Sequence, residues 1–341
     1  MPIGIALLGT GRIAETAFVP AVQAVAGAHL VAVLSRDQAR GDAFAQQYGI
    51  PQAYHCLHTL LQNSQIEAVI VATPDVMHEP QVIAAAQAGK HILCEKPMTA
   101  TVAGCNRMVE SVRSSGITFA MGYNNRFNTG LKRIKAMLED GAIGSVRYAR
   151  ALMTTQMQDP SGWRAVGEQS RYWALSATGT HLIDCFRWYF GEPDSVGGVL
   201  SAPVHQGPND DLSTLILNYP GRLLAELTAS AVFRSGNRLE LYSETGSIIA
   251  EDVFGSRANG PITCNGQPIL YEAENSFIGQ ITDFVDAIQQ QRQPRVTLED
   301  GLRNVRIMEA ARERSLLTKL NDEIGNDSSM ASTHGGRSHL N

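Results

Sequence analysis

Short apolar runs alternate with segments of helical period between Ile3 and about Met121. The predicted strands are Ile3–Leu8, Leu30–Leu34, Ala68–Ala72, His91–Cys94 and Thr118–Met121. The predicted helices between them include Gln38–Tyr48, Glu79–Ala88 and Val102–Ser114. Because each strand is apolar along almost its whole length, we expect both of its faces to be buried, as in a parallel sheet with helices on both sides.

The pattern changes after Gly122, where predicted strands come in succession. These strands are Ser145–Met153, Leu212–Tyr219, Leu223–Ala229, Leu239–Ser243 and Ser247–Ala250. Their alternating positions, with tight turns at Pro220-Gly221 and Thr245-Gly246, are typical of a largely antiparallel sheet. The helices expected to cover one face are Asn128–Glu139, Gly179–Tyr189, Ser276–Gln290 and Glu299–Arg314. We expect the open face to bind a partner subunit in a homodimer or homotetramer.

The composition excludes several classes of protein. Hydrophobic residues make up 44% and charged residues 18% of the 341 positions, as in a chain with packed cores. The net charge of -5, without a dense block of Lys and Arg, argues against a nucleic-acid partner. The uncharged stretch 16–35 is interrupted by Pro20, Gln23, Gly27 and His29, so it predicts a helix followed by a strand and no membrane span.

The five cysteines, Cys56, Cys94, Cys105, Cys185 and Cys264, form no Cys-x-x-Cys pair and are odd in number. This pattern predicts neither a disulfide framework nor a metal site, and we expect buried thiols in a reducing compartment. No basic residue precedes the glycine-rich turn that begins at Gly9, so no secretory signal is recognised and we expect a cytoplasmic protein.

The segment Gly9-Thr10-Gly11-Arg12-Ile13-Ala14 follows the first predicted strand and opens a helix. This is the glycine pattern of a dinucleotide-binding loop in the context that it requires; a plain turn is the alternative. The first glycine permits the tight turn, and the second lets the backbone approach a pyrophosphate at the positive end of the helix. The predicted cofactor contacts in this loop are Gly9, Thr10, Gly11, Arg12 and Ile13.

The end of the second predicted strand bears on the choice between NADP and NAD. An NAD site usually carries an acid there for the ribose 2′-hydroxyl, but this chain has Ser35-Arg36, with Arg40 one helical turn further on. A hydroxyl and guanidinium groups suit a 2′-phosphate, which favours NADP and leaves NAD possible. The alternative is that Ser35 caps the following helix while both arginines are solvated.

Together these features predict an α/β Rossmann domain with a doubly wound parallel sheet at residues 1–121. An α+β domain with a largely antiparallel open sheet is predicted at 122–321, for substrate binding and oligomerisation. Residues 322–341 are rich in Ser, Asn, Gly and His and are predicted to be disordered.

Several further motifs occur in the order of one known family. In the first domain they are Ala72-Thr73-Pro74 with His78, Gly89-Lys90-His91 and Cys94-Glu95-Lys96-Pro97. In the second they are Gly122-Tyr123-Asn124-Asn125-Arg126-Phe127, Gly141-Ala142-Ile143-Gly144 and Gly179-Thr180-His181-Leu182-Ile183-Asp184. Over residues 3–318 the chain resembles the Gfo/Idh/MocA oxidoreductases, which include glucose-fructose oxidoreductase, inositol dehydrogenases and 1,5-anhydrofructose reductase. The most specific motif is Glu-Lys-Pro directly after the predicted strand His91–Cys94.

The resemblance implies hydride transfer between a nicotinamide and a carbon that bears a hydroxyl or carbonyl, with Lys96 and His181 as catalytic residues. At the carboxyl end of a parallel strand, the Lys96 ammonium can polarise a substrate oxygen; a solvated strand-end lysine is the alternative. His181 would move the hydroxyl proton, because its ordinary pKa of about 6.5 suits neutral pH. Substrate contacts are expected from Lys96, Arg126, Tyr172 and His181, although Arg126 could instead tie the domains together.

The resemblance also implies cofactor contacts from Thr73, Pro74, His78, Glu95, Lys96, Asn124, Trp163 and Arg164. The pair Trp163-Arg164 resembles one that some NADP-using relatives place against the cofactor; a surface loop is the alternative. Asp184 is expected to be structural, because it can pair with Arg187 on the same helix face.

One departure from the family pattern concerns proton transfer. Many catalytic members carry an Asp four residues before the histidine, where this chain has Ala177. Either His181 works with a hydroxyl such as Tyr172, Ser176 or Thr180, or the acid/base machinery is incomplete.

The leading hypothesis is an NADP(H)-dependent oxidoreductase acting on a sugar, cyclitol or related polyhydroxylated small molecule, without a metal. A trans-dihydrodiol or other cyclic hydroxy-ketone substrate is a second hypothesis, because Tyr172 and Trp173 also suit an apolar substrate. The rival from another class is a sensor that binds NAD(P) without turnover, which Ala177 favours and the retention of Lys96 and His181 opposes.

Overall fold

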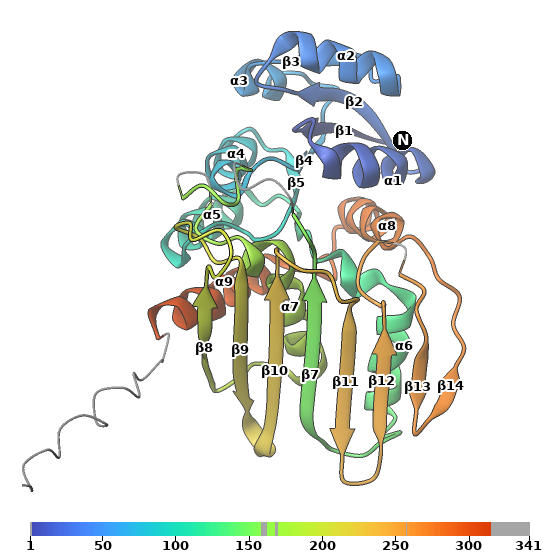
Figure 1. Ribbon diagram of the computed structural model, residues 1–341. Coiled ribbons are helices and arrows are strands. Elements are labelled where there is room, and N and C mark those ends of the chain that lie inside the picture. The colour runs from blue at the N-terminus through green and yellow to red at the C-terminus, as the bar shows by residue number, and fades with distance from the viewer. Residues whose placement is uncertain (1, 158–161, 168–169, 257, 315–341) are drawn as a thin grey trace, which may run out of the picture.

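The computed structural model describes residues 2–157, 162–167, 170–256 and 258–314, which form two sheets (Figure 1). The first sheet contains β1 (Ile3–Leu8), β2 (Ala28–Leu34), β3 (Gln52–Tyr54), β4 (Ala68–Val71), β5 (His91–Cys94) and β6 (Phe119–Met121). All neighbours are parallel, in the order β3-β2-β1-β4-β5-β6. This confirms the predicted doubly wound sheet, whose strand order reverses between β1 and β4.

The helices of this half are η1 (Ala14–Phe18, a π-helix), α1 (Val19–Ala24), α2 (Gln38–Tyr48), α3 (Leu57–Leu61), α4 (Asp75–Gln87) and α5 (Val102–Ser115). The stretch 16–35 is a helix followed by a strand, as predicted. The α4 helix begins at Asp75, earlier than the predicted start at Glu79, and it contains Pro80. Proline lacks the N–H donor and its ring crowds the preceding turn, so it often marks a helix start; in α4 it lies inside the helix instead.

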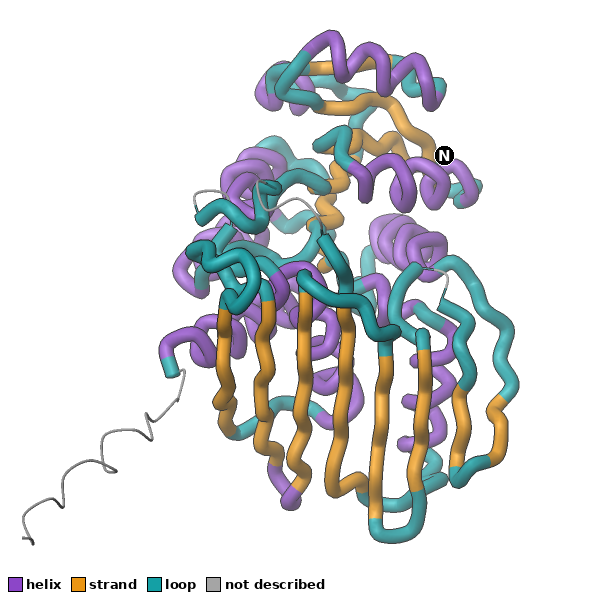
Figure 2. The backbone as a smooth tube through the Cα atoms, in the orientation of Figure 1, coloured by secondary structure: helices purple, strands orange, loops and turns teal. Residues whose placement is uncertain are grey.

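The second sheet contains β7 (Val146–Thr154), β8 (Ser195–Ser201), β9 (Leu212–Tyr219), β10 (Leu223–Ser230), β11 (Arg238–Ser243), β12 (Ser247–Glu251), β13 (Ile262–Cys264) and β14 (Gln267–Ile269). The strand order is β14-β13-β12-β11-β7-β10-β9-β8, and among these pairs only β7–β10 is parallel. The strands of this sheet lie side by side, in orange, in Figure 2. The predicted, largely antiparallel sheet is confirmed, with β8, β13 and β14 as strands that the prediction missed.

The remaining helices are η2 (Asn124–Phe127), α6 (Thr129–Glu139), η3 (Leu175–Gly179, a π-helix), α7 (Thr180–Phe190), η4 (Pro220–Arg222), α8 (Ser276–Gln289) and α9 (Leu298–Glu313). Apolar side chains of α6, α7 and α9 join the core on one face of the second sheet (Figure 1).

The prediction that 276–290 also covers the second sheet is wrong. Phe277, Ile281 and Phe284 of α8 belong to the core of the first sheet, where the Phe277 ring meets the Phe18 ring of η1 edge to face at 5.3 Å. The apolar period predicted the helix itself, but the period alone does not indicate which sheet the helix covers.

The expectation of uniformly buried thiols is also wrong. Cys94, Cys105 and Cys185 are buried, but Cys264 is half-buried and Cys56 is exposed at the start of α3. Among the described helices, none combines the length and the apolar character needed to cross a bilayer. The predicted tail at 322–341 lies outside the described residues.

Candidate functional site

The carboxyl ends of β1, β4 and β5 meet at one edge of the first sheet. Leu8 lies in register with Val71, and Val71 in register with Cys94. The glycine loop, the turn after β4 and the Glu95-Lys96-Pro97 segment therefore emerge side by side. In open α/β sheets this edge, next to the reversal of strand order, is the place for a ligand.

The two glycines of the first loop do different things. Gly9 has a φ of +116°, and a Cβ there would lie 2.7 Å from the carbonyl oxygen of Ala72. Gly11 has no other group within 4 Å of the place where its Cβ would stand. Gly9 thus makes the turn against β4, while the space at Gly11 fits the close approach of a dinucleotide pyrophosphate.

The end of β2 carries no acid, and Ser35 there is only 4% exposed. The cap of α2 is Asp37, which accepts a hydrogen bond from the Arg40 amide at 2.7 Å. Ser35 therefore does not cap α2. The Arg40 guanidinium donates to the carbonyl oxygen of Thr10 at 2.9 Å, while Arg36 is exposed. One arginine is thus fixed against the glycine loop, and the other is free to turn toward an anion.

Lys96 reaches from the end of β5 to the segment that precedes α7. Its Nζ donates to the carbonyl oxygen of Ala177 at 2.9 Å and to that of Ser176 at 3.4 Å. Burial and the neighbouring Arg164 lower the pKa of Lys96 to about 8, against the opposing charges of Glu95 and Asp75. A strand-end lysine with such contacts is not a solvated one.

His181 is the second residue of α7 and is 7% exposed. Its Nδ1 is buried without a hydrogen-bond partner among the described residues. Burial, followed by the charges of Lys96 and Arg164, lowers the pKa of His181 well below its ordinary value. This direction favours the neutral form of the imidazole and moves its titration away from neutral pH.

Trp163 and Arg164 form a stacked pair, with the guanidinium carbon 4.0 Å from the ring centroid. Asn209 donates to the Arg164 carbonyl oxygen at 2.7 Å, and the Arg164 Nε is buried with no partner in the described part of the chain. The charge of Arg164 contributes, after burial, to lowering the pKa of both Lys96 and His181. The contact of Trp163-Arg164 with a cofactor stays a prediction.

Two carboxyl groups complete this charge cluster. Glu95 is 7% exposed, and burial raises its pKa; its side chain accepts a hydrogen bond from the Lys96 amide at 3.1 Å. Asp75, at the start of α4, is 2% exposed and accepts hydrogen bonds from Ser170 and Ser176. Sequence reasoning missed Asp75, although an acid directly after the Thr73-Pro74 turn was a usable signal.

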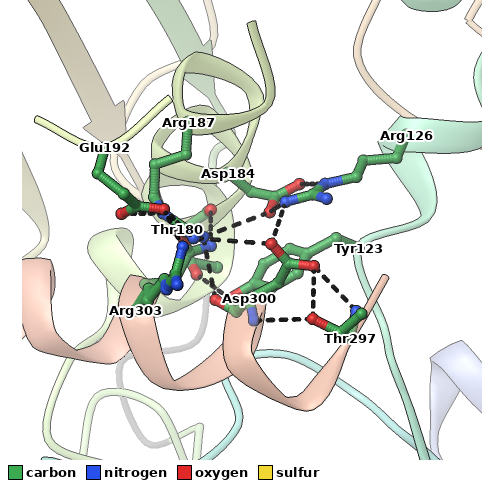
Figure 3. A network of polar contacts seen from close by, with 10 residues as sticks. Tyr123, Arg126, Thr180, Asp184, Arg187, Glu192, Thr297, Asp300 and Arg303 are labelled. Carbon is green, nitrogen blue, oxygen red and sulfur yellow. Dashed lines mark hydrogen bonds and ion pairs between the residues drawn. The ribbon is translucent and has the colours of Figure 1, made fainter. Parts of the chain in front are cut away.

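Arg126 belongs to a separate network of hydrogen bonds and ion pairs (Figure 3). Its Nε and Nη2 donate to both Asp184 oxygens at 2.9 and 2.7 Å, and its Nη2 also donates to Asp300 at 2.8 Å. Asp184 and Arg187 are 4.0 Å apart, as the helix spacing predicted. The guanidinium expected at the substrate therefore joins η2 to α7 and α9. All three elements lie within the predicted second domain, so these bonds do not tie the two domains together.

Three other predicted contacts, His78, Thr73 and Asn124, have internal partners. His78 is buried, with its ring nitrogens 2.9 Å from the carbonyl oxygens of Pro97 and Thr73. The Thr73 hydroxyl donates to Gln81, and the Asn124 amide donates to Ser276. These residues shape the turns at the sheet edge.

Tyr172 does not join the cluster around Lys96. It is 1% exposed within the core of the second sheet, and burial raises its pKa to about 12. Its charged neighbours are Arg171, Arg312 and Glu309, not the groups around Lys96. No group of three or more potential metal ligands occurs within residues 2–157, 162–167, 170–256 and 258–314.

Two family models match the chain. Residues 3–123 match the oxidoreductase family with an NAD-binding Rossmann fold, and residues 131–249 match the GFO/IDH/MocA C-terminal domain. Together they span the first sheet and strands β7 to β11 of the second.

Individual relatives agree with this match. The chain is 30% identical to trans-1,2-dihydrobenzene-1,2-diol dehydrogenase of Mus musculus over 59% of its length, and the match spans 60% of that enzyme. It is 26% identical to myo-inositol 2-dehydrogenase of Thermotoga maritima, over 94% of this chain and 99% of the relative. The crystal structure of aldose-aldose oxidoreductase from Caulobacter crescentus matches with a TM-score of 0.85 and 27% identity, over 92% and 98% of the two chains. The chain belongs to the Gfo/Idh/MocA family of oxidoreductases.

Proposed function

We propose that this protein is an NADP(H)-dependent oxidoreductase that acts on a hydroxyl or carbonyl carbon of a sugar, a cyclitol or a related small molecule. One observation carries the proposal. At the sheet edge where the glycine loop leaves space for a dinucleotide, Lys96 bonds the turn that leads into α7 and His181. The charge of Arg164 acts on both Lys96 and His181.

The contacts of Lys96 define its part in the reaction. An ammonium group has three N–H donors, and two of them point to the carbonyl oxygens of Ser176 and Ala177. The third is available to a substrate oxygen, whose developing negative charge the ammonium would stabilise. With a pKa of about 8, Lys96 can also release and recover this proton near neutral pH.

His181 would act as a neutral partner. Because its pKa lies well below the ordinary value, its ring can accept a hydrogen bond or a proton from a substrate hydroxyl. A bound nicotinamide cofactor would supply or accept the hydride, with the Gly9–Gly11 loop holding its pyrophosphate and Trp163-Arg164 next to its reactive end.

The preference for NADP rests on the end of β2. Ser35 presents a hydroxyl where an acid would repel a 2′-phosphate, and Arg36 is exposed beside it.

The test of this preference is a titration of the cofactor-stripped protein with NADPH and NADH, followed by nicotinamide fluorescence. We expect tighter binding of NADPH and a shift toward NADH in Ser35→Asp. Tighter binding of NADH by the wild type would overturn the preference, and binding of neither would overturn the proposed function.

The substrate class is tested by a panel of sugars, cyclitols and trans-dihydrodiols with the preferred cofactor. Turnover of polyols alone would support the proposal, and turnover of dihydrodiols alone would favour the activity named for the mouse relative. Tight binding of the cofactor with no turnover of any member would favour a sensor.

We also propose that the protein self-associates through the open face of the second sheet. Ile216, Leu224 and Tyr242 are exposed there by 45%, 43% and 36%, and no described helix covers them (Figure 1). Tyr148 and Tyr242 stack on the same face at 6.1 Å. The same face carries the ion pairs Arg150–Glu226 and Arg238–Glu240 between these side chains. Exposed apolar side chains grouped on one open sheet face are typical of subunit contacts. Light scattering should find a dimer or tetramer that Leu224→Arg dissociates; a wild-type monomer would refute the proposal.

A further inference from the structure

Asp75 is a buried carboxylate that the mechanism proposed above does not use. It follows the turn after β4 and is the first residue of α4, so it lies at the same sheet edge as Lys96. Only 2% of its surface is exposed. A carboxylate buried this deeply requires compensating hydrogen bonds and cations.

Its compensating hydrogen bonds come from the other half of the chain. Asp75 Oδ2 accepts from the Ser170 hydroxyl at 3.1 Å and from the Ser176 hydroxyl at 2.8 Å. Both serines are buried at 1% or less. The carbonyl oxygen of the same Ser176 accepts a hydrogen bond from Lys96 Nζ. Asp75 and Lys96 therefore both bind the Ser176 turn, one through its hydroxyl and the other through its carbonyl oxygen.

The second oxygen of Asp75 has no such bond. Asp75 Oδ1 is buried and has no hydrogen-bond partner among the residues that the structure describes. Oδ2 therefore fixes the Ser176 turn through two hydrogen bonds, while no hydrogen bond from a described residue offsets the negative charge at Oδ1.

The charge of Asp75 acts on Lys96 together with several other charged groups. Arg164 lowers the pKa of Lys96, Glu95 and Asp75 raise it, and His181 is neutral. Burial also raises the pKa of Glu95, which weakens that residue as a permanent anion. In a site of low polarity, a fixed anion on the far side of the Ser176 turn favours the ammonium form of the lysine.

We propose that Asp75 is a positioning residue for the oxidoreductase reaction, which holds the Ser176 turn beneath Lys96 and supplies the negative charge that keeps the Lys96 amine protonated. This inference rests on the proposed function. Asp75 acts through Lys96 and does not itself contact the reacting atoms.

The test measures the titration of Lys96 directly. The chain contains five lysines, so selective ¹³Cε labelling gives five NMR signals, and loss of one signal in Lys96→Met assigns it. We expect the pKa of Lys96 to fall by roughly one unit in Asp75→Asn, because one opposite charge is removed. Asp75→Glu, which keeps the charge, should restore most of the wild-type value.

Two controls separate charge from general disturbance. Ser170→Ala removes one hydrogen bond to the same oxygen but leaves the carboxylate, so the Lys96 titration should stay in place. Lys90 is an internal reference, because its Nζ also donates to two carbonyl oxygens, those of Asn63 and Ile66, at a different end of the sheet. Its signal should titrate equally in wild type and Asp75→Asn.

An unchanged Lys96 titration in folded Asp75→Asn would overturn the inference. Asp75→Ser, a smaller neutral side chain, provides the same comparison if the amide prevents folding. The NMR titration needs neither cofactor nor substrate, so it gives its answer even if the protein binds no nicotinamide and the proposed function fails. Where turnover is found, the alkaline limb of kcat/KM should move to lower pH in Asp75→Asn by the same amount as the Lys96 titration.

Discussion

Replacing Lys96 by Met should abolish turnover and at the same time stabilise the folded protein at neutral pH. The environment lowers the pKa of Lys96 from 10.5 to about 8. At about 1.36 kcal/mol per unit, holding the amine charged in the folded state costs about 3 kcal/mol at pH 7. Methionine is of similar length and carries no charge to desolvate.

Part of this gain is offset by lost hydrogen bonds. Lys96 donates to two carbonyl oxygens, and removing each bond costs about 1 kcal/mol. A net stabilisation of about 1 kcal/mol at pH 7 is therefore expected. Because methionine does not titrate, the pH dependence of the difference in unfolding free energy between the wild type and Lys96→Met reports the titration of Lys96.

The direction of that dependence follows from proton binding. Between pH 8 and 10.5 the unfolded chain keeps the Lys96 proton while the folded chain loses it, so the wild type becomes more stable as pH rises. From pH 7 to pH 9.5 it should gain about 2 kcal/mol relative to Lys96→Met.

Urea unfolding followed by circular dichroism at both pH values measures this change. Lys132→Met on α6 removes a lysine elsewhere and controls for the general loss of one positive charge. A stability difference between wild type and Lys96→Met that is the same at pH 7 and pH 9.5 would refute the account of Lys96 as a lysine desolvated by its site. Retained turnover in Lys96→Met would refute its catalytic role.

Three further predictions use other parts of the site. Gly9→Ala should lower the free energy of unfolding by about 1–3 kcal/mol in thermal unfolding, because φ there is +116°. Gly11→Ala should leave unfolding unchanged, but it should weaken dinucleotide binding at least about tenfold in a fluorescence titration. Arg126→Met should cost about 3–5 kcal/mol in urea unfolding, since it leaves a buried carboxylate without its bidentate partner; a near-neutral effect would show that this ion pair is dispensable. Ala177→Asp should raise the alkaline limb of kcat/KM by roughly one pH unit, because a carboxylate beside Lys96 stabilises its ammonium form; an unchanged profile would place position 177 outside the proton path.

The elements that the sequence predicted well are those whose burial is uniform. β1, β4 and β5 are buried along their length, apart from the half-buried His91 that begins β5, and continuous apolar runs identified them. β8 was missed because Gly197-Gly198 weakens a strand signal. Gly198 is nevertheless required, since a Cβ there would lie 2.3 Å from a carbonyl oxygen of the neighbouring β9. The hairpin of β13 and β14 had a usable signal in Asn265-Gly266, whose positive φ angles suit a tight turn.

The sequence predicted part of the candidate site, but not Asp75, the separate network of Arg126 or the electrostatics of the cluster. Motif order identified Lys96, Arg164 and His181, because each follows a recognisable turn or opens a helix. Their pKa values depend on burial and on charges brought from other elements, which no local pattern contains. For the same reason Arg126 looked available to a substrate, although two carboxylates from α7 and α9 hold it.

The absence of an acid at position 177 has a different meaning once these contacts are known. An incomplete acid/base pair would leave Lys96 without a fixed partner, but backbone carbonyl oxygens at the π-helical η3 segment receive its ammonium directly. Breaks in regular helical bonding of this kind free carbonyl groups and are frequent at functional sites. Burial, followed by the charge of Arg164, lowers the pKa of Lys96 to about 8, which suits proton exchange near neutral pH, and burial favours the neutral form of His181. Ala177 is therefore consistent with an enzyme in which the lysine carries the proton that a histidine–aspartate pair would otherwise handle.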